Sequence, residues 1–525
     1  MGDDISTAGS LVRTARRQAI GDLLHRSAAR TPDAVAIVFG DLRQTYAGLD
    51  EAVNRTANAL TARGIRRGDR LAMFAHNHHA YVVVWLATAR LGVISVPINF
   101  MLTADEVAYV LGHAGATAIV AEDALAPVAD AAVAQLDDPS VVALRGVIGG
   151  PVDGWEPVDD WIAHDDASDP DVDVADDDPI QIMYTSGTES RPKGATLSSR
   201  ALIAQYVSCI VEGRMTAKDV EVHALPLYHC AQLHVFLMPD LYLGATSIVL
   251  PAPDAATILA TIERERVTKL FCPPTVWISL LRHPDFDTRD LSSLRKGYYG
   301  ASIMPVGVLR EILRRLPDVE LFNLYGQTEM SPLATFLAPE DQERKAGSAG
   351  RAALNVETRV VDENDDDVAV GEVGEIIHRS PQAMLGYWND PEKTAAMFRN
   401  GWLHSGDLGV MDDEGFITVV DRKKDMIKSG GENVASREVE ETIYQHPAVS
   451  EVAVFGVPDE KWIEAVAAVV VVRDGQTVGS DELTAFCRER LAGFKVPKRI
   501  TFTDALPKNA SGKVLKRELR EQPAS

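Results

Sequence analysis

The sequence predicts an α/β protein with a large N-terminal domain of parallel sheets flanked by helices and a small α+β domain at the C-terminus. Three observations lead to this fold class. With 525 residues, the chain is longer than a single hydrophobic core normally supports. Its first half alternates strand-like and helix-like runs, which is typical of parallel sheets covered by helices. Beyond residues 421–425 the pattern becomes compact and mixed, which indicates a second unit of about a hundred residues.

The elements of the first half follow from short apolar runs. Residues 71–75 and 93–97 predict strands, and the longer apolar run 80–91 between them predicts a helix. Residues 165–178 are rich in aspartate and have no aliphatic periodicity, so we expect a solvated surface connector there. The apolar run 180–183 then indicates the end of a strand.

Later elements fit the same scheme until the pattern changes near residues 421–425. An acidic loop over 362–367 lies between two predicted strands, 357–361 and 374–378, and a further strand is expected over 415–420. The small domain should contain a helix over 436–445, strands over 449–457 and 465–472, and a helix over 481–492. The expected boundaries are a flexible tail over 1–18, an N-terminal domain over 19–421, a junction over 422–425 and a C-terminal domain over 426–525.

Composition narrows the classes of function. The chain is 46% apolar and 24% charged, as in ordinary soluble globular proteins. Its formal net charge of −24 argues against nonspecific nucleic-acid binding and against anionic membrane surfaces, while leaving room for local basic pockets. No apolar run is long enough to span a bilayer. The four scattered cysteines show neither metal-ligand spacing nor a disulfide framework, so a reducing cytoplasm is the simplest setting.

Residues 184–194, with the sequence YTSGTESRPKG, combine the features of a polyphosphate-binding loop. Small residues let backbone N–H groups approach phosphate oxygens, hydroxyl groups donate further hydrogen bonds, and Lys193 supplies a positive charge. The loop is not a Walker loop, because Gly194 rather than a serine or threonine follows Lys193. Taken alone, the segment is equally compatible with a solvated turn.

The loop resembles the phosphate loop of the adenylate-forming superfamily, which comprises acyl-CoA synthetases, luciferases and peptide-synthetase adenylation domains. The resemblance extends from about Ile20 to Arg517, because further family motifs follow in the same order. One pair departs from the family pattern, since Glu189 and Ser190 stand where the family usually has Thr-Gly. The further motifs are YGQTE at 325–329, SGDL at 405–408, DRKKD at 421–425, GGEN at 430–433 and PKNASGK at 507–513.

The resemblance implies a two-step reaction that uses ATP, Mg²⁺ and CoA. A carboxylate first attacks the α-phosphorus of ATP, which gives an acyl-adenylate and pyrophosphate. The thiol of CoA then attacks the acyl carbon, and AMP leaves. Because the first step brings two anions together, the site must neutralise charge on the phosphates and on the carboxylate.

The resemblance also assigns the nucleotide site residue by residue. Thr328 should donate to the α-phosphate, and Glu329 should hold Mg²⁺. Asp407 should accept hydrogen bonds from the ribose hydroxyls, assisted by Arg422 at the junction. The expected phosphate cradle consists of Thr185, Ser186, Gly187, Thr188 and Lys193. The expected adenine site consists of Tyr325, Gly300 and Ala301, and Gly326 is a further expected nucleotide-binding residue.

The C-terminal part of the chain should serve both steps in turn. Lys513 matches the family's late lysine, which reaches the substrate carboxylate and the α-phosphate during adenylation. Lys424 falls at the family's hinge, so the junction 422–425 is expected to bend and the small domain to be mobile. Gly431 and its neighbour lie in the loop that faces the site for thioester formation, where glycine lets a narrow pantetheine arm pass. Lys428 is a further candidate for contact with the adenylate or CoA.

The acyl pocket is expected near residues 226–229, PLYH, which resemble the family's Pro-Leu-Phe-His segment. In the family that histidine lies by the substrate carboxylate, although a histidine there can equally be structural, so the role of His229 stays open. No aspartate follows His229 where amino-acid-activating relatives place one for the α-ammonium group. The side chains expected to line the pocket are His229, Cys230, Leu233, Val276, Trp277 and Met330, and most are apolar.

From these residues we expect a cytoplasmic, AMP-forming acyl-CoA synthetase that acts on a medium- or long-chain fatty acid. An aryl- or phenylpropenoate-CoA ligase and an acyl-AMP ligase that loads a carrier protein remain alternatives. The non-enzymatic alternative is a nucleotide-binding regulatory protein, but such a protein would be expected to lack Lys513 or Glu329, and both are present. The expected partners are a small-molecule carboxylic acid and CoA, with no nucleic acid and no integral membrane association, and a homodimer is left open.

Overall fold

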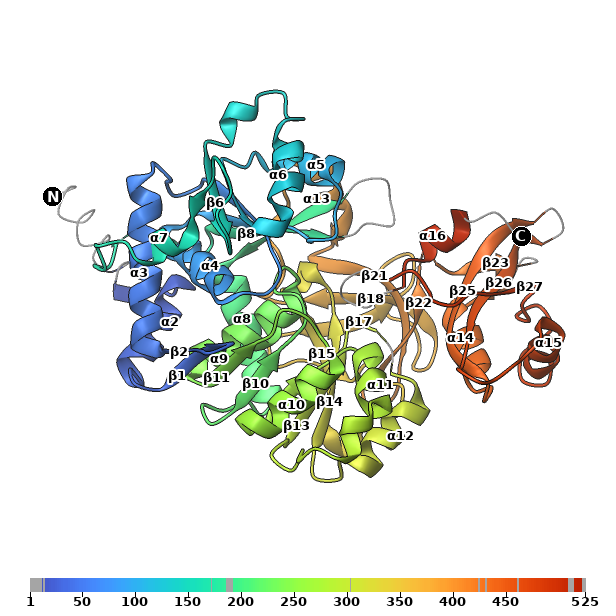
Figure 1. The fold of residues 1–525 in the computed structure, drawn as a ribbon. Helices are drawn as coiled ribbons and strands as arrows, with labels where there is room; N and C mark the ends of the chain where they lie inside the picture. The colour runs from blue at the N-terminus through green and yellow to red at the C-terminus, as the bar shows by residue number, and fades with distance from the viewer. Residues whose placement is uncertain are drawn as a thin grey trace.

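The computed structural model consists of a large N-terminal domain and a small C-terminal domain, which confirms the predicted fold class (Figure 1). In Figure 1 the large domain runs from blue to pale orange, and the small domain is the orange-red unit beside β22. Within the described part of the chain, no helix combines the length and the apolar character needed to cross a membrane. The structure describes residue 12 and residues 15–170, 172–185, 192–302, 304–423, 425–429, 432–459, 462–508 and 514–521.

The first sheet joins eight strands in the order β19-β9-β8-β4-β3-β5-β6-β7. The strands from β8 to β7 pair in parallel, as the alternating pattern predicts. β8 and β9 form an antiparallel hairpin in which Thr185 pairs with Lys193, so both ends of the expected phosphate loop lie side by side. The strands are β3 (Arg70–Phe74), β4 (Ile94–Pro97), β5 (Ala118–Glu122), β6 (Leu144–Ile148), β7 (Glu156–Pro157), β8 (Pro179–Thr185), β9 (Lys193–Ser198) and β19 (Gly386–Tyr387).

The second sheet joins nine strands in the order β16-β15-β14-β13-β12-β10-β11-β1-β2. Its central strands, from β14 to β1, are parallel, so their carboxyl ends meet at one edge of the sheet. β15, β16 and β2 add antiparallel strands at the two sides. The strands are β1 (Val35–Phe39), β2 (Leu42–Thr45), β10 (Val220–His223), β11 (Thr246–Val249), β12 (Lys269–Phe271), β13 (Lys296–Gly300), β14 (Glu320–Gly326), β15 (Leu333–Leu337) and β16 (Arg351–Ala352).

Helices cover both sheets and fill the space between them. α5 and α6 share a hydrophobic cluster with the first sheet, and α10, α11 and α12 share another with the second. α8 and a π-helix (Ala231–Leu237) contribute to clusters with both sheets, so they lie between the layers. The helices are α2 (Gly21–Arg30), α3 (Tyr46–Ala62), α4 (His79–Leu91), α5 (Ala104–Ala114), α6 (Ala126–Val133), α7 (Val158–Ile162), α8 (Ser199–Glu212), α9 (Met238–Leu243), α10 (Ala255–Glu265), α11 (Pro274–Arg282), α12 (Val306–Arg315) and α13 (Pro391–Met397).

A third, antiparallel sheet lies next to the small domain (Figure 1). The small domain has its own hydrophobic core between its sheet and the helices α14 and α15. The amino end of α14 contacts the large domain, since Ser436 N donates to Asp421 Oδ2 at 2.6 Å and Arg437 donates to Val419 O. The elements are β17 (Glu357–Val361), β18 (Val373–Arg379), β20 (Phe398–Arg399), β21 (Trp402–Met411), β22 (Ile417–Arg422), β23 (Ile427–Ser429), β24 (Glu432–Val434), α14 (Ser436–Tyr444), β25 (Val449–Asp459), β26 (Ile463–Val472), α15 (Ser480–Arg488), β27 (Arg499–Phe502) and α16 (Lys516–Glu521).

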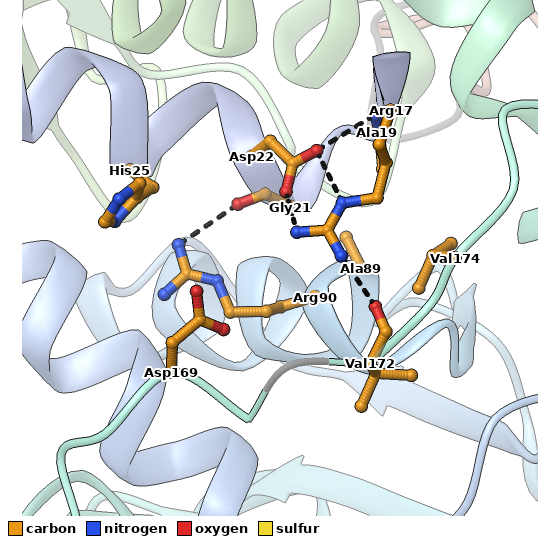
Figure 2. Close-up of a pocket in the computed structure, with 10 residues that line it drawn as sticks. All are labelled: Arg17, Ala19, Gly21, Asp22, His25, Ala89, Arg90, Asp169, Val172 and Val174. Carbon is orange, nitrogen blue, oxygen red and sulfur yellow. Dashed lines mark hydrogen bonds and ion pairs between the residues drawn. The ribbon is translucent and has the colours of Figure 1, made fainter. Parts of the chain in front are cut away.

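The aspartate-rich connector has no regular element in its described residues, as expected, but its backbone is held in place. Asn58 Nδ2 donates to Ser168 O at 2.8 Å, and Arg17 Nη1 donates to Val172 O at 3.0 Å. Arg17, which lies in the stretch expected to be a tail, also pairs with Asp22 at 2.8 Å (Figure 2). The hollow drawn in Figure 2 measures about 10 Å³, which leaves room for a single water molecule at most.

Candidate functional site

Several residues expected to bind the nucleotide lie where β13 and β14 end. The backbone is tightly packed at this point. A Cβ atom on Gly326 would lie 1.9 Å from Pro332 O, and one on Gly300 would lie 2.4 Å from Leu324 O. Both positions therefore require glycine. Ala301, which follows Gly300, has a φ of +62°, a left-handed conformation that is uncommon outside glycine. Thr328 opens a short 3₁₀ turn, Thr328–Met330, directly after this crowded point.

Glu329, the expected Mg²⁺ ligand, is held by a tyrosine that the motifs do not mark. Tyr387 Oη donates to Glu329 Oε1 at 2.7 Å. Lys193 Nζ lies 5.5 Å from the centroid of the same tyrosine ring. Tyr387 is placed there by β19, which pairs with β9 through Tyr387 and Ala195. One aromatic side chain thus contacts both the candidate metal ligand and the candidate phosphate lysine.

Asp407, the expected ribose acceptor, is a buried carboxylate at the edge of this site. Its Oδ2 atom accepts a hydrogen bond from Tyr325 Oη at 2.8 Å. Its Oδ1 atom lies 3.1 Å from Arg422 Nε, because β21 and β22 pair these two residues, but makes no hydrogen bond of good geometry within the described residues. Burial and the neighbouring carboxylate raise the pKa of Tyr325, so its hydroxyl stays protonated and donates. The remaining lone pairs of Asp407 suit a pair of hydroxyl donors.

A contact between two side chains joins the expected acyl pocket to the residues expected to bind the nucleotide. Cys230 Sγ lies 3.3 Å from Thr328 Oγ1. Burial raises the pKa of Cys230 to about 12, so the thiol stays protonated and unreactive at neutral pH. His229 is half-buried beside it, and its Nδ1 atom accepts from Ala231 N at 3.2 Å as the π-helix begins. Met330 is buried in the hydrophobic cluster behind Thr328.

The other expected pocket residues lie at different depths. Leu233 is buried on the π-helix. Trp277 packs within the cluster beneath α10, α11 and α12, and its Nε1 atom donates to Tyr298 O at 3.0 Å. Val276 borders both that cluster and the one that contains Met330. Val276 therefore packs against the cluster that lies behind Thr328.

In the C-terminal part, Lys428 is exposed on β23, and its backbone N donates to Glu464 Oε2 at 2.7 Å. The segment that carries Lys513 is flanked by a bridge between Lys508 and Val514. Hydrogen bonds, an ion pair, a ring contact and neighbouring strand ends join one set of expected residues into a connected region: Lys193, Tyr325, Gly326, Thr328, Glu329, Asp407, Arg422 and Cys230. The expected residues Ser186, Gly187, Thr188, Lys424, Gly431 and Lys513, and also Glu189, lie outside the described residues.

Comparison with known proteins gives the family. The family model described as AMP-binding enzyme matches residues 24–388, and the model described as AMP-binding enzyme C-terminal domain matches residues 438–513. A feruloyl-CoA synthase of Amycolatopsis is 39% identical over 97% of this chain and 99% of its own length. A long-chain-fatty-acid–CoA ligase of Mycobacterium tuberculosis is 36% identical over 96% of this chain and 98% of its own.

A solved structure agrees with these matches. A crystal structure of an anthranilate CoA ligase in complex with anthranoyl-AMP superposes with a TM-score of 0.89 at 27% identity, and covers 96% of each chain. Enzymes of this kind use ATP, Mg²⁺ and CoA. The chain belongs to the AMP-binding enzyme family and, within it, to the adenylate-forming acyl-CoA ligases.

Proposed function

We propose that this protein joins a carboxylic acid to CoA through an acyl-adenylate, with AMP and pyrophosphate as the other products. The contact between Cys230 and Thr328 carries the proposal, because it joins the wall of the expected acid pocket to the expected α-phosphate donor. The acid carboxylate and the α-phosphate of ATP would then meet beside Thr328, with Glu329 as its neighbour in the chain.

The residues of the site divide the work of adenylation. Asp407, oriented by Tyr325 and Arg422, would hold the ribose, and Thr328 would donate to the α-phosphate. Glu329 offers the hard carboxylate oxygen that Mg²⁺ prefers, and the metal would neutralise charge on the phosphate oxygens. Lys513 would approach the carboxylate from the small domain. For that approach we propose a hinge at 422–425, between a domain over 19–421 and a mobile domain over 426–525, with a tail over 1–18.

For the acid we propose an apolar carboxylate, since most of the side chains expected to line the pocket are apolar, namely Leu233, Val276, Trp277 and Met330. A medium- or long-chain fatty acid is the first candidate, in line with the fatty-acid–CoA ligase at 36% identity. An arylpropenoic acid is the second candidate, favoured by the feruloyl-CoA synthase at 39% identity. The four cysteines are free and buried, which fits the reducing cytoplasm that we propose as the location.

A screen of acids tests the proposal and separates the candidates. The purified protein is incubated with ATP, Mg²⁺, CoA and one acid at a time, from a series of fatty acids and a series of arylpropenoic acids. We expect acid-dependent release of AMP and pyrophosphate together with an acyl-CoA thioester. Adenylation without transfer to free CoA would instead indicate a ligase that loads a carrier protein. Release of ADP, or no response to any acid, would contradict the proposed function.

A further inference from the structure

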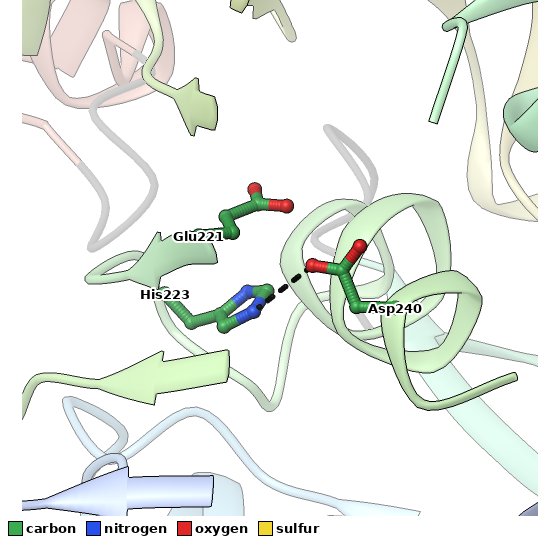
Figure 3. A group of neighbouring side chains, drawn as sticks. All are labelled: Glu221, His223 and Asp240. Carbon is green, nitrogen blue, oxygen red and sulfur yellow. Dashed lines mark ion pairs between the residues drawn. The ribbon is translucent and has the colours of Figure 1, made fainter. Parts of the chain in front are cut away.

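Four ionisable side chains form a closed cluster beneath the π-helix: Glu221 and His223 on β10, Asp240 on α9 and Lys269 on β12 (Figure 3 shows the first three). All four are fully buried, with 0% exposure. Lys269 Nζ lies 2.8 Å from Glu221 Oε2 and contacts Asp240 Oδ1. The ammonium group already supplies the positive charge that these carboxylates need, so the cluster is an internal ion network rather than a metal site.

The charges of this cluster balance internally. Burial raises the pKa of Glu221 despite the attraction of Lys269, so this carboxyl is neutral. Burial also disfavours the charged form of Asp240, but Lys269 outweighs it and lowers the pKa of Asp240 to about 2. Burial lowers the pKa of His223, which is therefore neutral as well. One ion pair, Lys269 with Asp240, remains, with two neutral partners beside it.

The cluster reaches the π-helix through Gln232. Gln232 Nε2 donates to His223 Nδ1 at 2.7 Å. Since Nδ1 accepts, the ring proton lies on Nε2, which is 3.5 Å from Asp240 Oδ2. Gln232 is thereby bound to the second sheet through a histidine that lies beside the ion network.

A second polar anchor holds the π-helix from the other sheet. His234 Nε2 contacts Gln181 Oε1 at 3.1 Å, and Gln181 lies on β8, the strand that leads into the expected phosphate loop. His234 Nδ1 contacts Tyr206 Oη on α8 at 2.8 Å. Burial lowers the pKa of His234 to about 3, so the ring is neutral and serves as a hydrogen-bonding group. Two residues of one helix are thus bound to opposite layers of the domain.

These anchors matter because a π-helix is a wide, uncommon turn that usually requires support from its surroundings. Relaxation to an α-helix would change the register and turn the following side chains by about 100° per residue of slip. The helix follows Cys230 directly and carries Leu233, so such a change would reshape the wall of the expected acid pocket. We propose that Gln232 and His234 are positioning residues that fix the register of this helix and thereby determine which acids the enzyme accepts. This inference rests on the proposed function.

Two variants test the inference from opposite sides of the helix. Gln232→Met removes the bond to His223 while keeping an unbranched side chain, and His234→Phe keeps the ring while removing both of its hydrogen bonds. The readout is the ratio of kcat/KM for the best fatty acid to kcat/KM for the best arylpropenoic acid. This ratio does not depend on the fraction of enzyme that is folded, so partial loss of stability cannot mimic the result.

Lys296→Met is the matched control. Lys296 pairs with Asp219 at 2.8 Å, and both side chains are largely buried. Lys296 lies beside Lys269 in the register of β13 and β12, but within the described residues no hydrogen bond joins Lys296 or Asp219 to Gln232 or His234. We expect at least a fivefold change of the acid ratio in each anchor variant, with the KM for ATP changed less than twofold. The control should keep the wild-type ratio.

An unchanged ratio in both anchor variants, or an equal change in Lys296→Met, would overturn the inference while leaving the proposed function intact. The proposed function fails separately, if the wild-type protein converts no acid at all.

Discussion

At the residue scale, the candidate site depends on side chains that hold the proposed ligands of Mg²⁺ and ATP in place. Glu329 accepts a hydrogen bond from Tyr387, and Asp407 accepts one from Tyr325. Hydrogen bonds to a charged partner contribute about 1.5–3 kcal/mol each. Removing one such bond should therefore weaken the binding of Mg²⁺ or ATP measurably without unfolding the protein.

Tyr387→Phe should raise the Mg²⁺ concentration for half-maximal ATP–pyrophosphate exchange roughly tenfold. The variant keeps the ring beside Lys193 but removes the donor to Glu329. A Mg²⁺ titration of the exchange reaction at saturating ATP, together with Mn²⁺ binding followed by electron paramagnetic resonance, provides the measurement.

Tyr46→Phe is the control for that experiment, because the Tyr46 hydroxyl donates to Ala245 O at 2.6 Å, away from the site. It should keep the wild-type Mg²⁺ requirement. Equal shifts in the two variants would show that Tyr387 has no particular relation to the metal.

Asp407→Asn should weaken ATP binding roughly tenfold, since the amide replaces a charged acceptor with a neutral one. The variant should also discriminate less between ATP and 3′-deoxy-ATP than the wild type does, because the ribose hydroxyl loses its best acceptor. The KM values of both nucleotides in wild type and variant provide the measurement. If Asp407→Asn discriminates between ATP and 3′-deoxy-ATP as well as the wild type does, the Asp407 carboxylate does not bind the ribose.

At the element scale, apolar runs are sufficient to predict the regular parts of the fold. The predicted helix over 80–91 corresponds to α4, because the segment is mostly apolar and Gly92, with a φ of +65°, ends it. The helix predicted over 481–492 stops at Arg488 instead, since boundaries are less marked than interiors. β19 has two residues, too few to show any periodicity.

In the candidate site, some residues can be predicted from local sequence, while others depend on contacts between distant segments. The resemblance to family motifs indicates Thr328, Glu329 and Asp407, because each lies within a short contiguous motif. Tyr387 could not be predicted in this way, because its role arises from the pairing of β19 with the distant β9. The π-helix is also a tertiary feature, since polar groups from two sheets and α8 hold Gln232 and His234.

Gly326→Ala should destabilise the protein by about 1–3 kcal/mol and reduce exchange activity. The added Cβ would lie 1.9 Å from Pro332 O, so the backbone at Gly326 or Pro332, on either side of the turn Thr328–Met330, must move. Gly307→Ala in α12 is the matched control, because nothing lies within 4 Å of the added atom. This change should be neutral or stabilising by up to about 1 kcal/mol. Urea unfolding gives the free energy of unfolding of both variants. A Gly326→Ala variant as stable as the wild type would contradict the predicted clash with Pro332 O.

At the scale of the whole molecule, the two half-reactions should need two arrangements of the domains, with the junction absorbing the change. Lys424→Pro fixes φ near −65° and removes a backbone donor. We expect this variant to form acyl-adenylate but to transfer the acyl group to CoA at least tenfold more slowly, while Lys424→Ala retains both steps. Separate assays of the half-reactions provide the test. Normal thioester formation in the proline variant would place the hinge elsewhere.

The central claim is that the acid carboxylate attacks the α-phosphorus of ATP to form an acyl-adenylate, and oxygen transfer tests this most directly. The acid that the screen identifies as best is labelled with ¹⁸O in its carboxylate and converted with ATP, Mg²⁺ and CoA. Mass spectrometry then follows the label in the products. The account predicts one ¹⁸O atom in AMP for each acyl-CoA formed, because the bridging oxygen of the acyl-adenylate leaves with AMP. AMP without ¹⁸O, alongside acyl-CoA, would contradict it.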